Sequence, residues 1–273
     1  MGDAAPVGVI GGSGLYSLLD DAERIDVPTP YGAPSAPITV GSLAGRRVAF
    51  LPRHGAGHTL APHRIPYRAN IWALASLGVR ALVTSSAVGG LVPDAAPGVF
   101  VVPDQYLDRT TNRDGTFYDG ARVEHLAAPD PFDPQLRGLA VEALTGEGVP
   151  VMPTGTTVVI DGPRFATRAE SRFHAASGGT TINMTLAPET PLALELGIAP
   201  VNCSFVTDRD SAVDADHEDA VTADLVLARL AAAQPVIRRV ISAVVGRIPD
   251  DFRGASVMPD DAVAEVLARP VRR

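Results

Sequence analysis

Short apolar runs alternate with amphipathic stretches along this chain. Strands are expected over residues 7–10, 38–41, 48–51, 81–84, 99–102 and 199–205, with more within 151–160 and around 180–184. Most runs are unbroken, which is typical of strands covered on both faces. Helical spacing is expected over 67–77, 136–147, 168–176, 191–196 and about 217–245. Strands separated by helices predict an α/β fold: a single domain with a mixed, mostly parallel central sheet flanked by helices.

The 273 residues are long enough to bury a large core in one domain. We expect residues 1–248 to form that domain, and residues 249–273, with mixed charge and a weak helical pattern over 260–267, to form a peripheral tail. The first ten residues lack a basic region followed by a long apolar stretch, and no apolar run approaches membrane-spanning length. A soluble protein is therefore expected.

Charge and cysteine content exclude several classes of function. The formal net charge of −8 argues against a general binder of nucleic-acid backbones. All 23 basic residues are arginine, so Schiff-base chemistry and the lysine of a P-loop are excluded. Cys203 is the only cysteine, which excludes an internal disulfide and a multi-cysteine metal site. A reducing, cytoplasmic setting is expected.

Two carboxyl groups follow the apolar run at 199–205. If Asp208 and Asp210 continue the period of two of a strand, both leave it on the same face. One carboxyl can then stay neutral and donate a proton while the other stays ionised and accepts. A ligand with a ring nitrogen beside an exocyclic amine would use both. The alternative is a pair of solvated loop acids.

Small polar residues and one arginine also stand at strand ends. Ser13 lies in the turn Gly-Gly-Ser-Gly after the first strand, Arg53 and His54 follow another, and Ser86 and Ala87 follow a third. Backbone N–H groups, hydroxyls and a guanidinium suit an anion, and the carboxyl ends of parallel strands meet at one edge of a sheet. Each segment alone is also explained as an ordinary turn or a loop ion pair.

A metal site is not expected, although histidines are available. His58 and His63 follow His54, but no cysteine is near and no HExxH spacing occurs. Met184 and Phe165 also stand at the ends of predicted elements, where a thioether or a ring more often packs than contacts a ligand.

With these segments in this order, the chain resembles the trimeric purine nucleoside phosphorylases, most closely their methylthioadenosine phosphorylase branch. The resemblance runs from residue 8 to about 230. It rests on the segments 11–15, 53–55, 58–59, 67–74, 108–111, 117–120, 162–165, 168–171, 183–185 and 207–210. It implies a single α/β domain, a homotrimer and reversible phosphorolysis of a purine nucleoside. Inorganic phosphate is then the co-substrate, with no cofactor, no metal, and no nucleic-acid or membrane partner.

The resemblance also implies roles for individual residues. Its phosphate site corresponds to Ser13, Arg53, His54, Ser86, the backbone of Ala87, and Thr185. Its nucleoside site corresponds to Met184 under the ribose, Phe165 facing the base, Asp208 at N7 of the purine and Asp210 at the 6-amino group. Proton donation at N7 would make the base a neutral leaving group while phosphate closes on C1′.

Substrate choice depends on fewer positions. Relatives acting on 6-oxopurines carry asparagine where Asp208 stands and glutamate where Ala166 stands, so the resemblance favours adenine. Ala223 replaces the histidine of relatives that accept a 5′-hydroxyl, and Val226 lies one turn on, so a methylthio group is favoured. His125 would reach across the trimer interface to cover that group.

Other functions stay open at this point. A phosphorylase preferring methylthioinosine, inosine or guanosine is the alternative within the same class. A non-catalytic regulator that binds purine or phosphate belongs to a different class, because a fold does not guarantee chemistry. Loss of the proton donor or of the arginine would mark such a regulator, yet Asp208 and Arg53 are both present.

Overall fold

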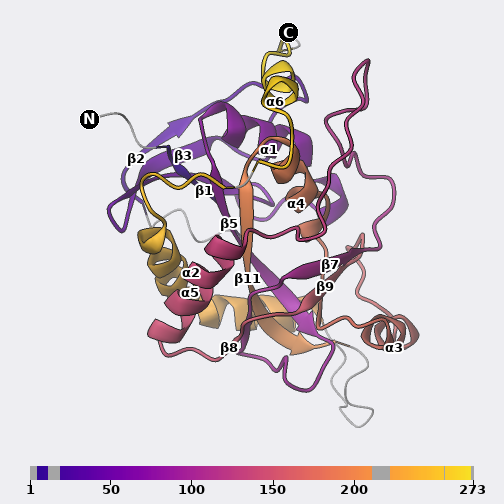
Figure 1. Cartoon of the computed structure of the whole chain (residues 1–273). Coiled ribbons are helices and arrows are strands. Elements are labelled where there is room, and N and C mark those ends of the chain that lie inside the picture. Colours follow the sequence, from indigo (N-terminus) through magenta and orange to yellow (C-terminus); the bar gives the residue numbers. More distant parts are fainter. Residues whose placement is uncertain (1–4, 12–18, 211–221, 255, 272–273) are drawn as a thin grey trace.

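The computed structural model describes residues 5–11, 19–210, 222–254 and 256–271. Within those ranges eleven strands join one sheet, and helices cover its faces (Figure 1). The strands are β1 (Val7–Gly11), β2 (Asp20–Ile25), β3 (Ile38–Leu43), β4 (Arg46–Pro52), β5 (Ala81–Gly90), β6 (Phe100–Val101), β7 (Gln105–Asp108), β8 (Val151–Met152), β9 (Thr156–Val159), β10 (Thr181–Asn183) and β11 (Ala199–Arg209). The helices are α1 (Tyr67–Ser76), α2 (Pro134–Gly146), α3 (Arg168–Ala176), α4 (Leu186–Glu195), α5 (Ala223–Arg247) and α6 (Asp260–Leu267), with a short 3-10 helix at Pro62–Arg64. The predicted α/β class with a mixed, mostly parallel sheet is confirmed.

Strand β5 is the branch point of the sheet. The main strand order is β2-β3-β4-β1-β5-β10-β9-β7, and a second branch runs from β5 through β11 and β6 to β8. The first half of β5 pairs in parallel with β1, and its last two residues pair antiparallel with β10. Along nearly its whole length β5 also pairs in parallel with β11. The ends of these strands therefore meet around the second half of β5.

Alternating side chains of the central strands enter two separate cores. Val7 and Val9 of β1 pack in one core, whereas Ile10 packs in the other. The same alternation divides Val48 and Phe50 from Ala49 and Leu51 on β4. Both faces of the sheet are buried, which explains why these strands read as unbroken apolar runs.

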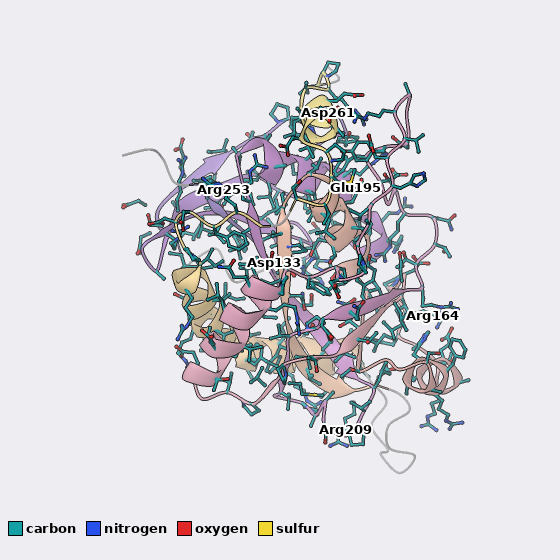
Figure 2. The ribbon with its side chains drawn as sticks, in the orientation of Figure 1. Asp133, Arg164, Glu195, Arg209, Arg253 and Asp261 are labelled. Carbon is teal, nitrogen blue, oxygen red and sulfur yellow. The ribbon has the colours of Figure 1, made fainter. Side chains whose placement is uncertain are left out.

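Two groups of helices supply the opposite sides of these cores. Helices α2 and α5 pack together on the first face, and α1, α4 and α6 cover the second (Figure 1). Asp133 begins α2, where its side chain accepts a hydrogen bond from Leu136 N at 2.9 Å (Figure 2). Such a cap satisfies one of the free N–H groups of the first helical turn.

The sequence did not predict two strands, β2 and β7, that lie at the edges of the sheet. Strand β2 reads Asp-Asp-Ala-Glu-Arg-Ile and is almost entirely exposed, and β7 carries two exposed residues out of four. Each lies at an end of the main strand order and pairs with one neighbour. Hydrophobic patterning cannot find a strand that buries so little apolar surface, because its stability comes from backbone hydrogen bonds to that neighbour.

Helix α4 begins at Leu186, five residues before the proline that the sequence suggested as its start, and is kinked at Ala187, whose φ of −108° and ψ of 134° are not helical. Pro191 lies inside the helix. Arg113 NH1 donates to Ala187 O at 2.6 Å and to Met184 O at 2.9 Å, so the two carbonyl groups beside the kink have a hydrogen-bond partner. That partner comes from a distant loop, which no local pattern could reveal.

Residues 249–254 and 256–271, where the sequence suggested a peripheral tail, include side chains that pack into both cores. Phe252 joins the first core, and Met258 joins the second. On α6, Ala262 and Val266 are completely buried against the second core. Trp72 Nε1 on α1 donates to Val266 O at 3.1 Å. The apolar face of this short helix, rather than its mixed overall charge, decides its position.

None of the helices in the described ranges combines the length and apolar character required to cross a bilayer.

Removing residues 260–273 should expose the second core and the ring of Trp72. We expect a lower thermal unfolding midpoint and a red shift of tryptophan fluorescence, because Trp72 is the only tryptophan and donates its N–H to α6. Differential scanning calorimetry and emission spectra check this. Deleting only residues 270–273, which leaves α6 whole, is the control. An unchanged midpoint and emission maximum after the longer deletion would contradict the packing described above.

Candidate active site

One cavity of about 390 Å³ collects almost all of the predicted site residues. It opens where β5, β10 and β11 end and is closed on one side by α5. The predicted residues that line it are Arg53, His54, Ser86, Ala87, Phe165, Ala166, Met184, Thr185, Asp208, Asp210, Ala223 and Val226. Ser13 lies outside the described residues. His125 is exposed on the loop between β7 and α2 and does not line this cavity.

Asp208 and Asp210 enter the cavity on either side of Gly89. A β-bulge between Val206 and Asp208 shifts the register, so Asp208 lies opposite Gly89 on β5. A Cβ atom on Gly89 would lie 3.1 Å from Asp208 Oδ1 and 3.1 Å from Asp210 Cβ. Both acids are 4% exposed, and both line the cavity. The absent side chain of Gly89 leaves room for the pair.

The surroundings of Asp208 favour its protonated form. Burial raises its pKa from 3.8 to about 6, and the negative charge of Asp210 adds to that rise. A hydrogen bond between Asp208 Oδ2 and the Thr207 hydroxyl, 2.7 Å long, opposes it. A carboxyl group whose pKa lies closer to neutral pH can serve as a general acid.

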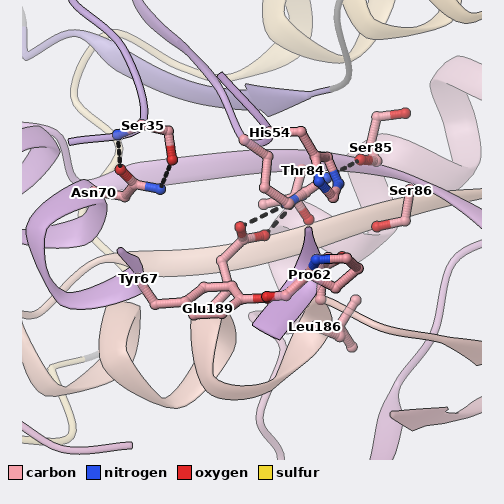
Figure 3. Close-up of polar contacts among 12 residues, drawn as sticks. Ser35, His54, Pro62, Tyr67, Asn70, Thr84, Ser85, Ser86, Leu186 and Glu189 are labelled. Atoms are coloured by element: carbon pink, nitrogen blue, oxygen red, sulfur yellow. Dashed lines mark hydrogen bonds and ion pairs between the residues drawn. The ribbon is translucent and has the colours of Figure 1, made fainter. Parts of the chain in front are cut away.

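In another part of the cavity, the buried carboxylate of Glu189 holds the Arg53 side chain in place. Its Nε and NH2 atoms donate to the two carboxylate oxygens of Glu189, each at 2.8 Å, and NH1 donates to Ser85 O at 2.8 Å (Figure 3). Burial alone would lower the pKa of Arg53, but the charge and hydrogen bonds of Glu189 outweigh this and raise it. The guanidinium is therefore charged, and its orientation is set before any ligand enters.

His54 is a neutral neighbour of that guanidinium. Its Nδ1 lies 2.9 Å from Leu60 O, which can only accept, so Nδ1 carries the hydrogen and Nε2 is left as an acceptor. Burial and the charge of Arg53 lower the pKa of His54 to about 4. The ring also stacks on His58 at a centroid distance of 4.3 Å. Near neutral pH it therefore adds no positive charge.

A buried network orients the Ser86 hydroxyl. Asn202 Nδ2 donates to Thr84 Oγ1 at 2.8 Å and to Ser86 Oγ at 3.1 Å, and Ser204 Oγ donates to Asn202 Oδ1 at 2.6 Å. Because Ser86 Oγ accepts from the amide, its own hydrogen remains to be donated in another direction. This part of the cavity thus offers oriented donors, while the charges of Arg53 and Glu189 balance each other.

The remaining walls are mostly apolar. Met184 packs under Gly162, where a Cβ atom would lie 2.4 Å from the Met184 sulfur, and Gly162 has a φ of +63°. Phe165 and Ala166 form a second wall beside it. Helix α5 closes the cavity with Ala223, Val226, Leu227, Leu230, Gln234 and Ile237. Flat aromatic rings and small apolar groups fit such surfaces.

Sequence reasoning missed the residues that hold the predicted ones in place. Glu189, Asn202 and Thr207 orient Arg53, Ser86 and Asp208, respectively. Glu189 is 2% exposed within an otherwise apolar helical stretch. An acid in such a run is a signal that it pairs with a buried cation, and Arg53 was the available partner.

Within the described residues, no group of three or more histidine, cysteine, aspartate or glutamate side chains is arranged to hold a metal ion.

Comparisons with known proteins agree with this arrangement. The model of the phosphorylase superfamily matches residues 6–246. A purine nucleoside phosphorylase of Streptomyces coelicolor is 46% identical over 253 residues, covering 90% of each chain. An S-methyl-5′-thioadenosine phosphorylase of Mycolicibacterium smegmatis is 52% identical over 210 residues, covering 76% of this chain and 78% of the relative.

Solved structures of methylthioadenosine phosphorylases have the same fold as this chain. A methylthioadenosine phosphorylase from an antarctic soil metagenomic library superposes with a TM-score of 0.87 at 35% identity, covering 98% of this chain and all of the other. A methylthioadenosine phosphorylase from Schistosoma mansoni in complex with adenine gives a TM-score of 0.87 at 32% identity, covering 96% and 97%. The match of the family model spans most of the chain, so this protein belongs to the phosphorylase superfamily.

Proposed function

We propose that this protein catalyses the reversible phosphorolysis of 5′-methylthioadenosine to adenine and 5-methylthioribose 1-phosphate. The observation that carries the proposal is that a carboxyl pair and an oriented set of anion-binding donors line the same cavity. A relative named S-methyl-5′-thioadenosine phosphorylase from Pyrococcus furiosus, 44% identical and covering 90% of this chain, supports the choice of reaction.

The chemistry follows from the charges and donors of the site. Phosphate binds between Arg53, Ser86 and Thr185, and one of its oxygens attacks C1′ of the sugar. As the C1′–N9 bond breaks, its electron pair passes into the purine ring, and Asp208 donates its proton to N7. The base then leaves as neutral adenine. Phosphate is a co-substrate, and the reaction needs no metal or other cofactor. Holding both reactants in one cavity lowers the activation barrier through proximity.

The preference for adenine and for a methylthio group rests on two parts of the cavity. Asp210 accepts a hydrogen bond from the exocyclic amine, whereas the carbonyl of a 6-oxopurine would meet a carboxylate. Ala223 and Val226 present small apolar groups to the 5′ end of the sugar. A phosphorylase of 6-oxopurine nucleosides is the second candidate, since the Streptomyces coelicolor relative is named purine nucleoside phosphorylase.

We also propose that the active unit is a homotrimer in the cytoplasm. The loop between β7 and α2 extends from the body of the molecule (Figure 1), and His125 on it is exposed and is not among the residues that line its own cavity. His125 of the partner subunit would cover the methylthio group. The single cysteine, Cys203, is buried and free, which is compatible with a reducing compartment.

Phosphate dependence tests the reaction directly. With methylthioadenosine we expect adenine release only when phosphate is present, measured by chromatography of the products.

Substrate preference is measured with methylthioadenosine, methylthioinosine, inosine and guanosine. We expect kcat/KM for methylthioadenosine to exceed that for inosine by about 10- to 100-fold, the usual range for such differences in an apolar pocket. Equal release without phosphate would reject phosphorolysis, and a preference for inosine would favour the second candidate.

The proton on Asp208 makes stability depend on pH in a defined direction. The folded state binds this proton more tightly than the unfolded state, because the pKa of Asp208 is raised from 3.8 to about 6. The resulting stabilisation is full at about pH 3, below the unfolded pKa, and is lost by about pH 7, as the pH rises through the folded pKa. Between about pH 3 and about pH 7, the free energy of unfolding of the natural protein should fall by about 3 kcal/mol relative to Asp208→Asn.

Urea unfolding of both proteins at several pH values measures this difference. Asp94→Asn, which removes an exposed carboxyl group, is the control for the effect of removing a charge alone. A constant difference between the natural protein and Asp208→Asn would show that Asp208 does not hold its proton.

A further inference from the structure

Asp210 has a buried hydrogen-bond partner outside the cavity. The Ser171 hydroxyl donates to Asp210 Oδ2. Ser171 lies on α3 with no exposed surface, and it is not among the residues that line the cavity. It can therefore act on a ligand only through Asp210.

The first turn of α3 fixes Ser171 in this position. Thr167 caps the helix: its hydroxyl accepts from Glu170 N at 3.2 Å, and Glu170 Oε2 accepts from Thr167 N at 2.7 Å. Arg164 pairs with both oxygens of Glu170, each at 2.7 Å. Arg164 lies beside α3 in Figure 2. This reciprocal cap holds the turn on which Ser171 lies.

The Ser171 hydroxyl donates its hydrogen to Asp210 rather than to a backbone carbonyl. Ser171 Oγ is also 3.1 Å from Thr167 O, but that carbonyl already accepts the helical hydrogen bond from Ser171 N at 2.9 Å. A hydroxyl carries one hydrogen, and a carboxylate is a stronger acceptor than a carbonyl that is already bonded. Asp210 Oδ2 therefore accepts, which favours the ionised form of this carboxyl group.

The Thr207 hydroxyl beside Asp208 also donates to a carboxyl group. Thr207 Oγ1 donates to Asp208 Oδ2 at 2.7 Å and lies 3.3 Å from Val88 O. Burial outweighs this hydrogen bond and raises the pKa of Asp208 to about 6. Asp208 can therefore bind a proton, while the Ser171 hydroxyl favours the charge of Asp210.

We propose that Ser171 is a positioning residue that fixes Asp210 as a hydrogen-bond acceptor and thereby selects 6-aminopurines over 6-oxopurines. This inference rests on the proposed function and deepens it. A 6-amino group donates to the carboxylate, whereas a 6-oxo group needs a donor and would be repelled. Without Ser171, Asp210 loses the partner that favours its charge and can bind a proton, which lets it donate to a 6-oxo group.

Ser171→Ala tests this selection, with Ser177→Ala as its matched control. Ser177, also contributed by the α3 region, donates its hydroxyl to Phe173 O at 2.8 Å but is exposed and has no carboxylate partner. We expect Ser171→Ala to lower kcat/KM for methylthioadenosine about tenfold, the usual effect of losing one hydrogen bond to a charged group. The value for methylthioinosine should change less than about threefold, and Ser177→Ala should change neither.

A double-mutant cycle shows whether Ser171 acts through Asp210. We expect the tenfold effect of Ser171→Ala to fall below about twofold in a protein that already carries Asp210→Ala. An equal loss for both substrates would mean a general structural role and would overturn the proposal. The same tenfold effect in the Asp210→Ala background, or no effect of Ser171→Ala at all, would also overturn it.

Binding measurements separate this inference from the proposed function. If the natural protein releases no adenine from methylthioadenosine, the proposed reaction is wrong. The ratio of adenine to hypoxanthine affinity, measured by calorimetry for the natural protein and both serine variants, then decides the role of Ser171. A ratio that drops about tenfold only in Ser171→Ala supports selection by Ser171, and an unchanged ratio rejects it.

Discussion

The close pairing of β5 with three other strands is the constraint on which this site depends. Its second half, Ser85–Gly90, consists of small residues apart from Val88. A Cβ atom on Gly90 would clash with Ala95 O, and one on Gly89 would crowd Asp208, Asp210 and Ile182 of β10. A larger side chain at Gly89 would therefore displace the ends of β10 and β11. The acid pair, the hydroxyl of Ser86 and the arginine that follows β4 would then no longer share one cavity.

Charge within that cavity is arranged in compensated pairs. Arg53 and Glu189 form a bidentate ion pair in which both side chains are almost completely buried. Such a pair gives orientation rather than net attraction, because burying two charges costs much of what their contact returns. His54 is neutral near pH 7, and the raised pKa of Asp208, about 6, brings this carboxyl group closer to the pH range in which it can carry a proton. Phosphate therefore meets preorganised donors, and Asp208 can carry the proton that the leaving base needs. Both features favour the transition state over the separate reactants.

The sequence indicated the fold class and the polar residues at the strand ends that line the cavity, but not the contacts that hold them in place. Runs such as 7–10 and 48–51 are apolar on both faces, so periodicity and order were sufficient to predict buried, mostly parallel strands. Strand β2 is polar and exposed, so it carried no hydrophobic pattern. The weak helical pattern over 260–267 indicated α6, but the mixed charge around it gave no sign that Ala262 and Val266 pack into the second core. The partners Glu189 and Ser171 lie 136 and 39 residues from Arg53 and Asp210, and only the folded chain brings each pair together.

A crystal structure with adenine and phosphate bound is the most direct test of the central claim that one cavity joins proton donor and anion site. The account predicts phosphate within hydrogen-bond distance of the Arg53 guanidinium and the Ser86 hydroxyl. It predicts the purine with N7 against Asp208 and its 6-amino group against Asp210. Phosphate bound away from Arg53, or adenine turned so that N7 faces away from Asp208, would contradict it.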